Sequence, residues 1–226
     1  MIRAGIIGGA GYTAGELIRL LVNHPQVEIV FVHSTSNAGN RLADVHGGLE
    51  GDTDMRFCDS YDLGSADVVF LCSAHGQSKV WLAENTIPAG VKIIDLAQDF
   101  RDESEGFVYG LPELNRERIR RAERVANPGC FATAIQLALL PLAAAGLLQD
   151  EVHVTAVTGS TGAGVKPISV LVSMEDVASS RISIGGRHSI TRAIHKSCFC
   201  PWESPLPSSV ITVSYPSCIL LIKLWA

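Results

Sequence analysis

Short apolar runs alternate with helical patterns along the first half of the chain. Four runs are typical of β-strands that are buried on both faces: residues 2–7, 27–33, 66–72 and 91–96. Between them, the spacing of apolar residues predicts helices over residues 16–21 and 77–85. Because parallel neighbours need a crossover connection, this alternation indicates an α/β fold with a Rossmann-like, doubly wound parallel sheet.

The second half of the chain begins with a long apolar stretch. After a polar stretch around residues 106–123, residues 130–145 predict a helix that Pro141 kinks or ends. Residues 152–158 predict a further strand, which leads into a second glycine-rich turn. From about residue 168 onward only three of the 23 acidic residues remain, Ser and Pro are frequent, and no clear succession of helices and strands is predicted.

Composition and charge exclude several classes of protein. A chain of 226 residues with 47% hydrophobic residues can bury a sizeable core, so extensive disorder is excluded. The net charge of −5 gives no electrostatic footprint for nucleic acid or an anionic membrane. The six cysteines include no C-x-x-C pair, so neither a metal site nor a disulfide framework is predicted. The start of the chain lacks the features of a signal peptide, and Val210–Ala226 is too short and interrupted to span a membrane, which favours the cytoplasm.

The first candidate for chemistry is a glycine turn between a strand and a helix. Gly9-x-Gly11-x-x-Ala14 has the spacing of a dinucleotide-binding fingerprint, in which glycines let backbone amides approach a pyrophosphate. The alternative is an ordinary tight turn, but the strand-turn-helix context favours a nucleotide.

The residues after the second strand bear on which nucleotide would bind. An NAD site usually has an acidic residue there, whereas this chain has Ser34, Thr35 and Ser36, with Arg41 nearby. Hydroxyls and an arginine favour a 2′-phosphate and therefore NADP, although a plain polar loop is an alternative reading.

The second candidate is the segment Asn127-Pro128-Gly129-Cys130, which places Cys130 at the start of the long apolar helix. The helix dipole and unpaired amides at that position favour a nucleophilic thiolate. The alternative is a small buried residue, the usual role of a free cysteine, and it is the role we expect for Cys58 and Cys72.

The remaining candidates lie in loops. Ser160 and Gly162, in the second glycine-rich turn, and the nearby Lys166 could hold a carboxylate or phosphate, or form a flexible surface turn. Ser73 and His75 follow the third strand, and ligands bind at the carboxyl ends of strands in such sheets. Ordinary loop chemistry is the alternative for both groups.

Five motifs occur in a characteristic order: Gly8-x-x-Gly11-Tyr12-Thr13, Ala74-His75-Gly76, Asp99-Phe100-Arg101, Tyr109-Gly110-Leu111-Pro112-Glu113 and Asn127-Pro128-Gly129-Cys130-Phe131-Ala132-Thr133. Over about residues 1–167 the chain resembles the N-acetyl-gamma-glutamyl-phosphate reductases of arginine biosynthesis, within the semialdehyde dehydrogenase family. It is similar, more distantly, to aspartate-semialdehyde dehydrogenase.

The resemblance implies an NADP-dependent oxidoreductase that reduces an acyl phosphate to a semialdehyde through a thioester on Cys130. It implies an NADP-binding domain over residues 1–148, followed by an incomplete α/β or α+β domain for substrate and dimerisation over residues 149–226. A homo-oligomer is implied for the full-length family. The residues expected to bind NADP(H) are Gly8, Gly9, Gly11, Tyr12, Thr13, Ala14, Ser34, Ser36, Arg41, Ser73 and His75. Those expected to bind the substrate are Arg101, Asn127, Ser160, Gly162 and Lys166.

The sequence also departs from the family. Members continue beyond this length and carry a catalytic histidine, whereas His188 and His195 lie in no matching context. Two alternatives therefore accompany the reductase hypothesis. One is a truncated or frameshifted, catalytically incomplete NADP-binding fragment, and the other is an enzyme that acts on aspartyl phosphate.

Overall fold

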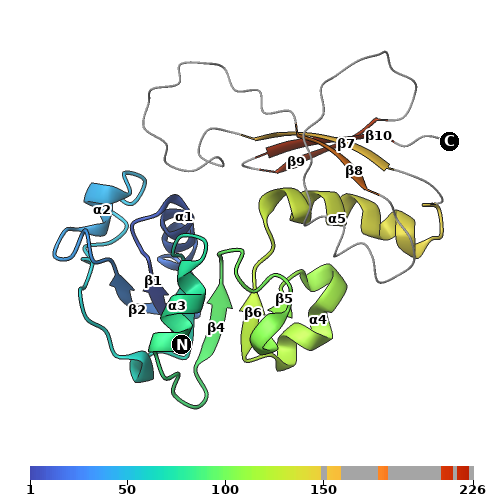
Figure 1. The fold of residues 1–226 in the computed structure, drawn as a ribbon. Helices are drawn as coiled ribbons and strands as arrows, with labels where there is room; N and C mark the ends of the chain where they lie inside the picture. Colours follow the sequence, from blue (N-terminus) through green and yellow to red (C-terminus); the bar gives the residue numbers. More distant parts are fainter. Residues whose placement is uncertain (149–151, 159–177, 183–209, 216–217, 224–226) are drawn as a thin grey trace. The chain divides into compact units, whose positions relative to one another are not determined.

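The computed structural model describes residues 1–148, 152–158, 178–182, 210–215 and 218–223 (Figure 1). The chain forms two compact units, Met1–Pro128 and Gly129–Ala226. The helix that starts at Cys130 belongs to the second of these units because it lies against strands of that unit. The domain bounds implied by the resemblance, 1–148 and 149–226, stay a prediction.

The first unit is built on a six-stranded parallel sheet. Its strands are β1 (Ile2–Ile7), β2 (Val27–His33), β3 (Val68–Leu71), β4 (Lys92–Asp95), β5 (Val108–Tyr109) and β6 (Arg124–Ala126). The strand order is β2-β1-β3-β4-β6-β5, and all pairs are parallel, which confirms the predicted sheet. The chain moves from β1 to one edge and then returns to the other side of β1. The winding therefore reverses between β1 and β3, where ligands bind in folds of this kind.

Both faces of this sheet are buried, as the continuous apolar strands predict. Ile6 and Val32 pack in one cluster with residues of helix α1 (Tyr12–Leu21). The adjacent Ile7 and Phe31 pack in a second cluster, on the opposite face, against Trp81 of helix α3 (Gln77–Glu84). Because neighbouring side chains of a strand point to opposite faces, α1 and α3 cover the two sides of a doubly wound sheet.

The polar stretch around residues 106–123 holds structure that the hydrophobic pattern did not predict. Strand β5 has only two residues, and helix α4 (Pro112–Arg121) has no buried residue and hence no apolar stripe. The available signals were the cap chemistry of α4: Pro112 at its first position and Arg118, Arg120 and Arg121 in its last turn.

The second unit consists of helix α5 (Cys130–Ala144) and a four-stranded antiparallel sheet ordered β8-β7-β10-β9. Its strands are β7 (Val152–Thr158), β8 (Ala178–Ile182), β9 (Val210–Tyr215) and β10 (Cys218–Lys223). Strand β7 was predicted from the sequence. Strands β8, β9 and β10 lie after residue 168, where no clear succession of helices and strands was predicted. The segment that forms β8, ASSRI, is too polar for an apolar strand pattern.

Two of the helices differ from or add to the sequence prediction. Helix α5 continues one turn past Pro141 and ends at Ala144. The short helix α2 (Leu42–Val45) follows β2 in the first unit. No helix among the described residues is long and apolar enough to cross a membrane.

Candidate functional site

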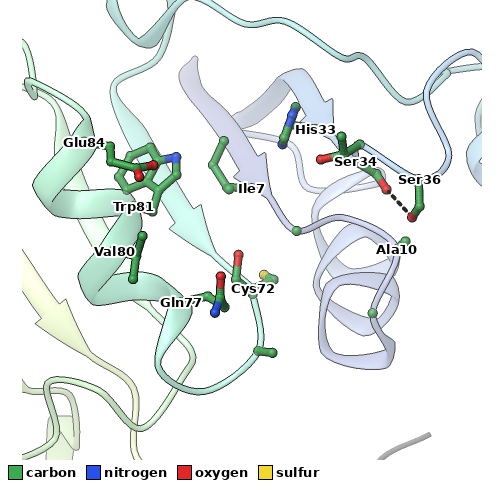
Figure 2. Close-up of a pocket in the computed structure, with 15 residues that line it drawn as sticks. Ile7, Ala10, His33, Ser34, Ser36, Cys72, Gln77, Val80, Trp81 and Glu84 are labelled. Carbon is green, nitrogen blue, oxygen red and sulfur yellow. Dashed lines mark hydrogen bonds between the residues drawn. The ribbon is translucent and has the colours of Figure 1, made fainter.

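A pocket of about 490 Å³ opens in the first unit at the carboxyl ends of β1, β2 and β3 (Figure 2). The loops after these strands and one face of α3 form its walls. Its lining comprises Ile7, Gly8, Ala10 and Gly11; His33 to Ser36; Cys72 to Ala74; and Gln77, Val80, Trp81 and Glu84. The pocket thus lies at the point where the winding of the sheet reverses, between β1 and β3.

The glycine turn after β1 approaches the loop after β3 closely. Gly8 has a φ of +76°, and a Cβ at this position would lie 2.8 Å from the backbone nitrogen of Ser73. A Cβ on Gly9 would lie 2.3 Å from Cγ1 of Val32. Gly11 caps the N-terminus of α1, whose free amides therefore begin at the pocket edge. The turn fits the pyrophosphate cradle that its spacing predicts.

Two serines after β2 contribute hydroxyls to the pocket. The Oγ atoms of Ser34 and Ser36 lie 3.5 Å apart, and the Asn37 side-chain amide donates to the Ser36 hydroxyl at 2.9 Å. Arg41, by contrast, does not line the pocket. Its guanidinium contacts Asp54 at 3.2 Å and Glu50 at 3.8 Å. The structure therefore brings the serines to the pocket while the arginine pairs with acidic residues.

An aromatic wall that the sequence analysis missed closes the side of the pocket formed by α3. The Trp81 indole donates a hydrogen bond to the Tyr61 hydroxyl at 2.8 Å. The Tyr61 ring contacts the His33 ring edge-on, with centroids 4.9 Å apart. Burial lowers the pKa of His33, so this wall is uncharged at neutral pH. One sequence signal could have predicted this side of the pocket. The spacing of four residues places them on one face of a helix: Gln77, Val80, Trp81 and Glu84.

Helix α3 is fixed by two acidic residues, Asp95 at the end of β4 and Asp99 in the loop that follows. Asp99 accepts hydrogen bonds from the backbone N–H groups of Gly76 at 2.7 Å and Lys79 at 3.2 Å, and so caps the start of the helix. Asp95 is fully buried and accepts from the Ser78 hydroxyl at 2.6 Å and from the Ala97 N–H at 3.1 Å. These contacts hold the pocket face of α3 against the sheet.

Burial raises the pKa of Asp95, and its Oδ2 atom has no hydrogen-bond partner among the described residues. The folded state therefore keeps a proton that the unfolded chain releases near pH 4. We expect the stability of Asp95→Asn relative to the natural chain to rise as the pH increases above about 4, because only the natural chain must ionise a buried carboxyl. Denaturant unfolding of both proteins across this range measures the difference, and parallel pH profiles would contradict it.

Cys130 is the first residue of α5 and belongs to the second unit. The N–H and hydroxyl of Thr133 both donate to the Gly129 carbonyl, at 2.8 Å and 2.9 Å, and fix this first turn. Cys130 is exposed, whereas Cys58 and Cys72 are partly buried. Cys72 lines the pocket, but burial raises its pKa to about 12, so it remains a thiol. Cys130 is thus the most accessible thiol among Cys58, Cys72 and Cys130.

The predicted substrate residues of the first unit lie together. The Arg101 Nε donates to the backbone carbonyl of Asn127 at 3.0 Å, and its Nη2 reaches the Leu96 carbonyl at 3.4 Å. Asn127 also donates through its backbone N–H to the Asp95 carbonyl at 2.7 Å. Ser160, Gly162 and Lys166 lie outside the described residues.

The other predicted cofactor residues surround the pocket without lining it. Tyr12 and Thr13 are exposed in the first turn of α1, and Ala14 is buried beneath that turn. The His75 Nδ1 accepts a hydrogen bond from the Gln98 N–H at 3.2 Å. Of the predicted set, the residues that line the pocket are Gly8, Gly11, Ser34, Ser36 and Ser73. Within the described residues, no group of three or more His, Cys, Asp or Glu side chains could hold a metal ion.

Comparisons with solved structures concern the fold. Aspartate semialdehyde dehydrogenase II from Vibrio cholerae matches with a TM-score of 0.58 at 24% identity, over 73% of this chain and 48% of that one. The aspartate semialdehyde dehydrogenase with NADP from Candida albicans matches with a TM-score of 0.58 at 18% identity, over 77% of this chain and 57% of that one. At these identities the likeness shows a shared fold.

Curated relatives are much closer in sequence. The N-acetyl-gamma-glutamyl-phosphate reductase of Azobacteroides pseudotrichonymphae is 64% identical over 74% of this chain and 53% of its own length. The reductase of the same name from Bacteroides thetaiotaomicron is 62% identical over 74% of this chain and 52% of its own length. The chain therefore spans about half the length of the curated relatives it matches.

Two family models match along the chain. The semialdehyde dehydrogenase dimerisation domain matches residues 130–195 and thus extends past residue 167, up to which the sequence showed a resemblance. The semialdehyde dehydrogenase NAD-binding domain matches residues 3–122, the span that holds the glycine turn, the serine pair and α3. Because this second match alone covers more than half of the 226 residues, the chain belongs to the semialdehyde dehydrogenase family.

Proposed function

We propose that this chain takes part in the NADPH-dependent reductive dephosphorylation of N-acetyl-gamma-glutamyl phosphate to N-acetyl-glutamate semialdehyde, a step of arginine biosynthesis. The observation that carries the proposal is the identity of about 60% to reductases of that name. It is supported by an exposed cysteine at the start of α5 and by a pocket that the glycine turn and the loops after β2 and β3 line. The reducing cytoplasm is the compartment that fits such a free thiol.

The pocket residues fit NADP(H). Gly8 lets the turn proposed to bind the pyrophosphate lie directly against the loop after β3, since its φ is +76° and a side chain there would collide with the backbone of Ser73. Ser34 and Ser36 would receive the 2′-phosphate, and no acidic residue ends β2 to repel it. Trp81 and Val80 would cover the apolar faces of the cofactor. Gly9, Tyr12, Thr13, Ala14, Arg41, Ser73 and His75 complete the proposed set.

The proposed chemistry uses Cys130 as nucleophile. Its thiolate attacks the acyl carbon, a carbon–sulfur bond forms, and the bond from that carbon to the phosphate oxygen breaks. NADPH, when bound, supplies a hydride to the thioester carbon. The carbon–sulfur bond then breaks, which releases the semialdehyde and restores the thiolate. Arg101, Asn127, Ser160, Gly162 and Lys166 are proposed to hold the anionic groups of the substrate.

We also propose that the second unit contributes substrate contacts and the interface between copies of the chain. The match of residues 130–195 to a dimerisation domain supports this role. The mass of the purified protein in solution, measured by light scattering, would test it.

Cofactor choice gives a prediction at Ser36. Ser36→Asp is expected to weaken NADPH binding by about 10-fold to about 100-fold, because the new carboxylate would repel the 2′-phosphate, and to leave NADH binding within about twofold. Ser60→Asp is the matched control, since Ser60 is an exposed serine that does not line the pocket. Fluorescence titrations of both cofactors measure the ratio. Equal loss of NADPH and NADH would contradict the placement of the 2′-phosphate.

The activity is tested by the reverse reaction on purified chain of verified mass. NADP reduction is measured with N-acetyl-glutamate semialdehyde, and in parallel with aspartate semialdehyde, each with and without phosphate. Phosphate-dependent turnover of the first substrate supports the proposal. Preference for aspartate semialdehyde would replace the substrate assignment. NADPH binding with no turnover would leave a cofactor-binding chain that lacks residues needed for the reaction.

A further inference from the structure

His46 lies behind the glycine turn, just after helix α2, and makes a direct contact with it. The His46 Nε2 lies 2.7 Å from the carbonyl oxygen of Gly9. Because a carbonyl can only accept a hydrogen bond, Nε2 must carry the proton and donate it. The backbone of His46 is itself held, since its N–H donates to Leu42 and its carbonyl accepts from Leu49, at 2.9 Å and 3.0 Å.

The ring of His46 is also seated against helix α1. A Cβ at Gly15 would lie 2.6 Å from the His46 Nδ1 and about as close to the rest of the ring. The ring contacts Phe57 on another side, with centroids 6.0 Å apart. Gly15 therefore provides the space that lets the ring reach the Gly9 carbonyl. His46 itself does not line the pocket, so it would act on a bound ligand only through the residues that it contacts.

The contact at the Gly9 carbonyl sets the direction of the next amide. In a trans peptide the C=O and N–H groups point in opposite directions, so the Gly9 carbonyl and the Ala10 N–H lie on opposite sides of one rigid plane. All peptide bonds of the described residues are trans. The Gly9 carbonyl contacts His46, which does not line the pocket, whereas Ala10 does line it (Figure 2). No hydrogen bond among the described residues uses the Ala10 N–H.

We infer that His46 is a positioning residue for the cofactor: it anchors the Gly9 carbonyl and thereby turns the Ala10 N–H toward the pyrophosphate. The inference rests on the proposed binding of NADP(H) in this pocket. Preorganised amides bind a phosphate more tightly because no backbone rotation has to be frozen on binding. A hydrogen bond to a charged acceptor accounts for about 10-fold to about 100-fold in affinity.

The test compares two ligands that differ in the pyrophosphate. NADPH contains it, whereas adenosine 2′-monophosphate carries only the adenine and the 2′-phosphate ribose. In His46→Leu, NADPH affinity is expected to fall by about 10-fold to about 100-fold, with affinity for adenosine 2′-monophosphate changed by less than about twofold. His46→Gln is expected to restore NADPH binding, because its amide nitrogen can donate from nearly the Nε2 position.

Two further variants make the test robust. Gly15→Ala keeps His46 but displaces its ring, and it should reproduce the selective loss even if His46→Leu fails to fold. His24→Leu is the matched control, because His24 is exposed and the hydrogen bond of its ring within the described residues comes from the neighbouring Gln26 N–H. It should leave both affinities unchanged.

The outcomes separate the inference from the proposed function. If the natural chain binds neither NADPH nor adenosine 2′-monophosphate, the proposed cofactor site and the inference are both overturned. Natural chain that binds both ligands, with NADPH affinity unchanged in His46→Leu and Gly15→Ala, would overturn the inference alone. Equal loss of both ligands in these variants would also overturn it, since a merely structural residue would act on both.

Discussion

Replacing Cys130 by serine is expected to lower the rate of the phosphate-dependent reaction by at least about 1,000-fold while NADPH affinity stays within about twofold. A serine hydroxyl is not ionised at neutral pH and so cannot replace the thiolate in the attack on the acyl phosphate. Cys130 is exposed in the first turn of α5, where the substitution removes little packing. Steady-state rates and NADPH titrations of the same preparations separate the two effects.

Cys58→Ser is the matched control for the loss of a thiol. The Cys58 sulfur contacts the Val32 carbonyl at 3.4 Å in the first unit and has no proposed part in the reaction. This variant should turn over at nearly the natural rate. Turnover of Cys130→Ser comparable to that of the control would remove Cys130 as the nucleophile.

Replacing Gly8 by alanine is expected to destabilise the protein by about 2–4 kcal/mol and to abolish measurable NADPH binding. Two physical effects add. The φ of +76° disfavours any side chain, and the new Cβ would lie 2.8 Å from the Ser73 nitrogen and 2.9 Å from the Cys72 carbonyl carbon. The turn and the loop after β3 would have to move apart, which would distort the turn proposed to bind the pyrophosphate. Denaturant unfolding and NADPH titration measure the two losses.

Gly39→Ala separates the two effects of the Gly8 substitution. Gly39 has a similar φ of +85°, but no atom lies within 4 Å of a Cβ built there. Its substitution should therefore cost only about 1–2 kcal/mol, from the backbone conformation, and should leave NADPH affinity unchanged. If both variants lost stability equally and both still bound NADPH, the close approach at Gly8 would have no role in the cofactor site.

The sheet and part of the pocket could be predicted from the sequence because they depend on local patterns. Buried parallel strands read as continuous apolar runs, and the glycine turn has a fixed spacing between a strand and a helix. Ligands bind at the carboxyl ends of parallel strands, so the serines that follow β2 and β3 could be predicted as site residues. Ser34, Ser36 and Ser73 do line the pocket, together with Gly8 and Gly11.

Other features depend on contacts between distant segments, which no local pattern reveals. In the sequence, Trp81 is one residue of a short predicted helix, and only the fold brings it to the pocket wall and into contact with Tyr61, twenty residues earlier. His46 reaches Gly9 across 37 residues. Arg41 was predicted from its charge and its proximity in sequence to the serines, but Asp54 and Glu50 compete for its guanidinium.

The central claim is that NADP(H) binds in the pocket between the ends of β1 and β3. It is tested most directly by following the backbone amide resonances of the isotope-labelled full chain during titration with NADP. The account predicts saturable shifts that are largest at Gly8 to Gly11, Ser34 to Ser36, and Ser73 with Ala74. Shifts concentrated elsewhere in the chain, or no shifts at saturating NADP, would contradict it.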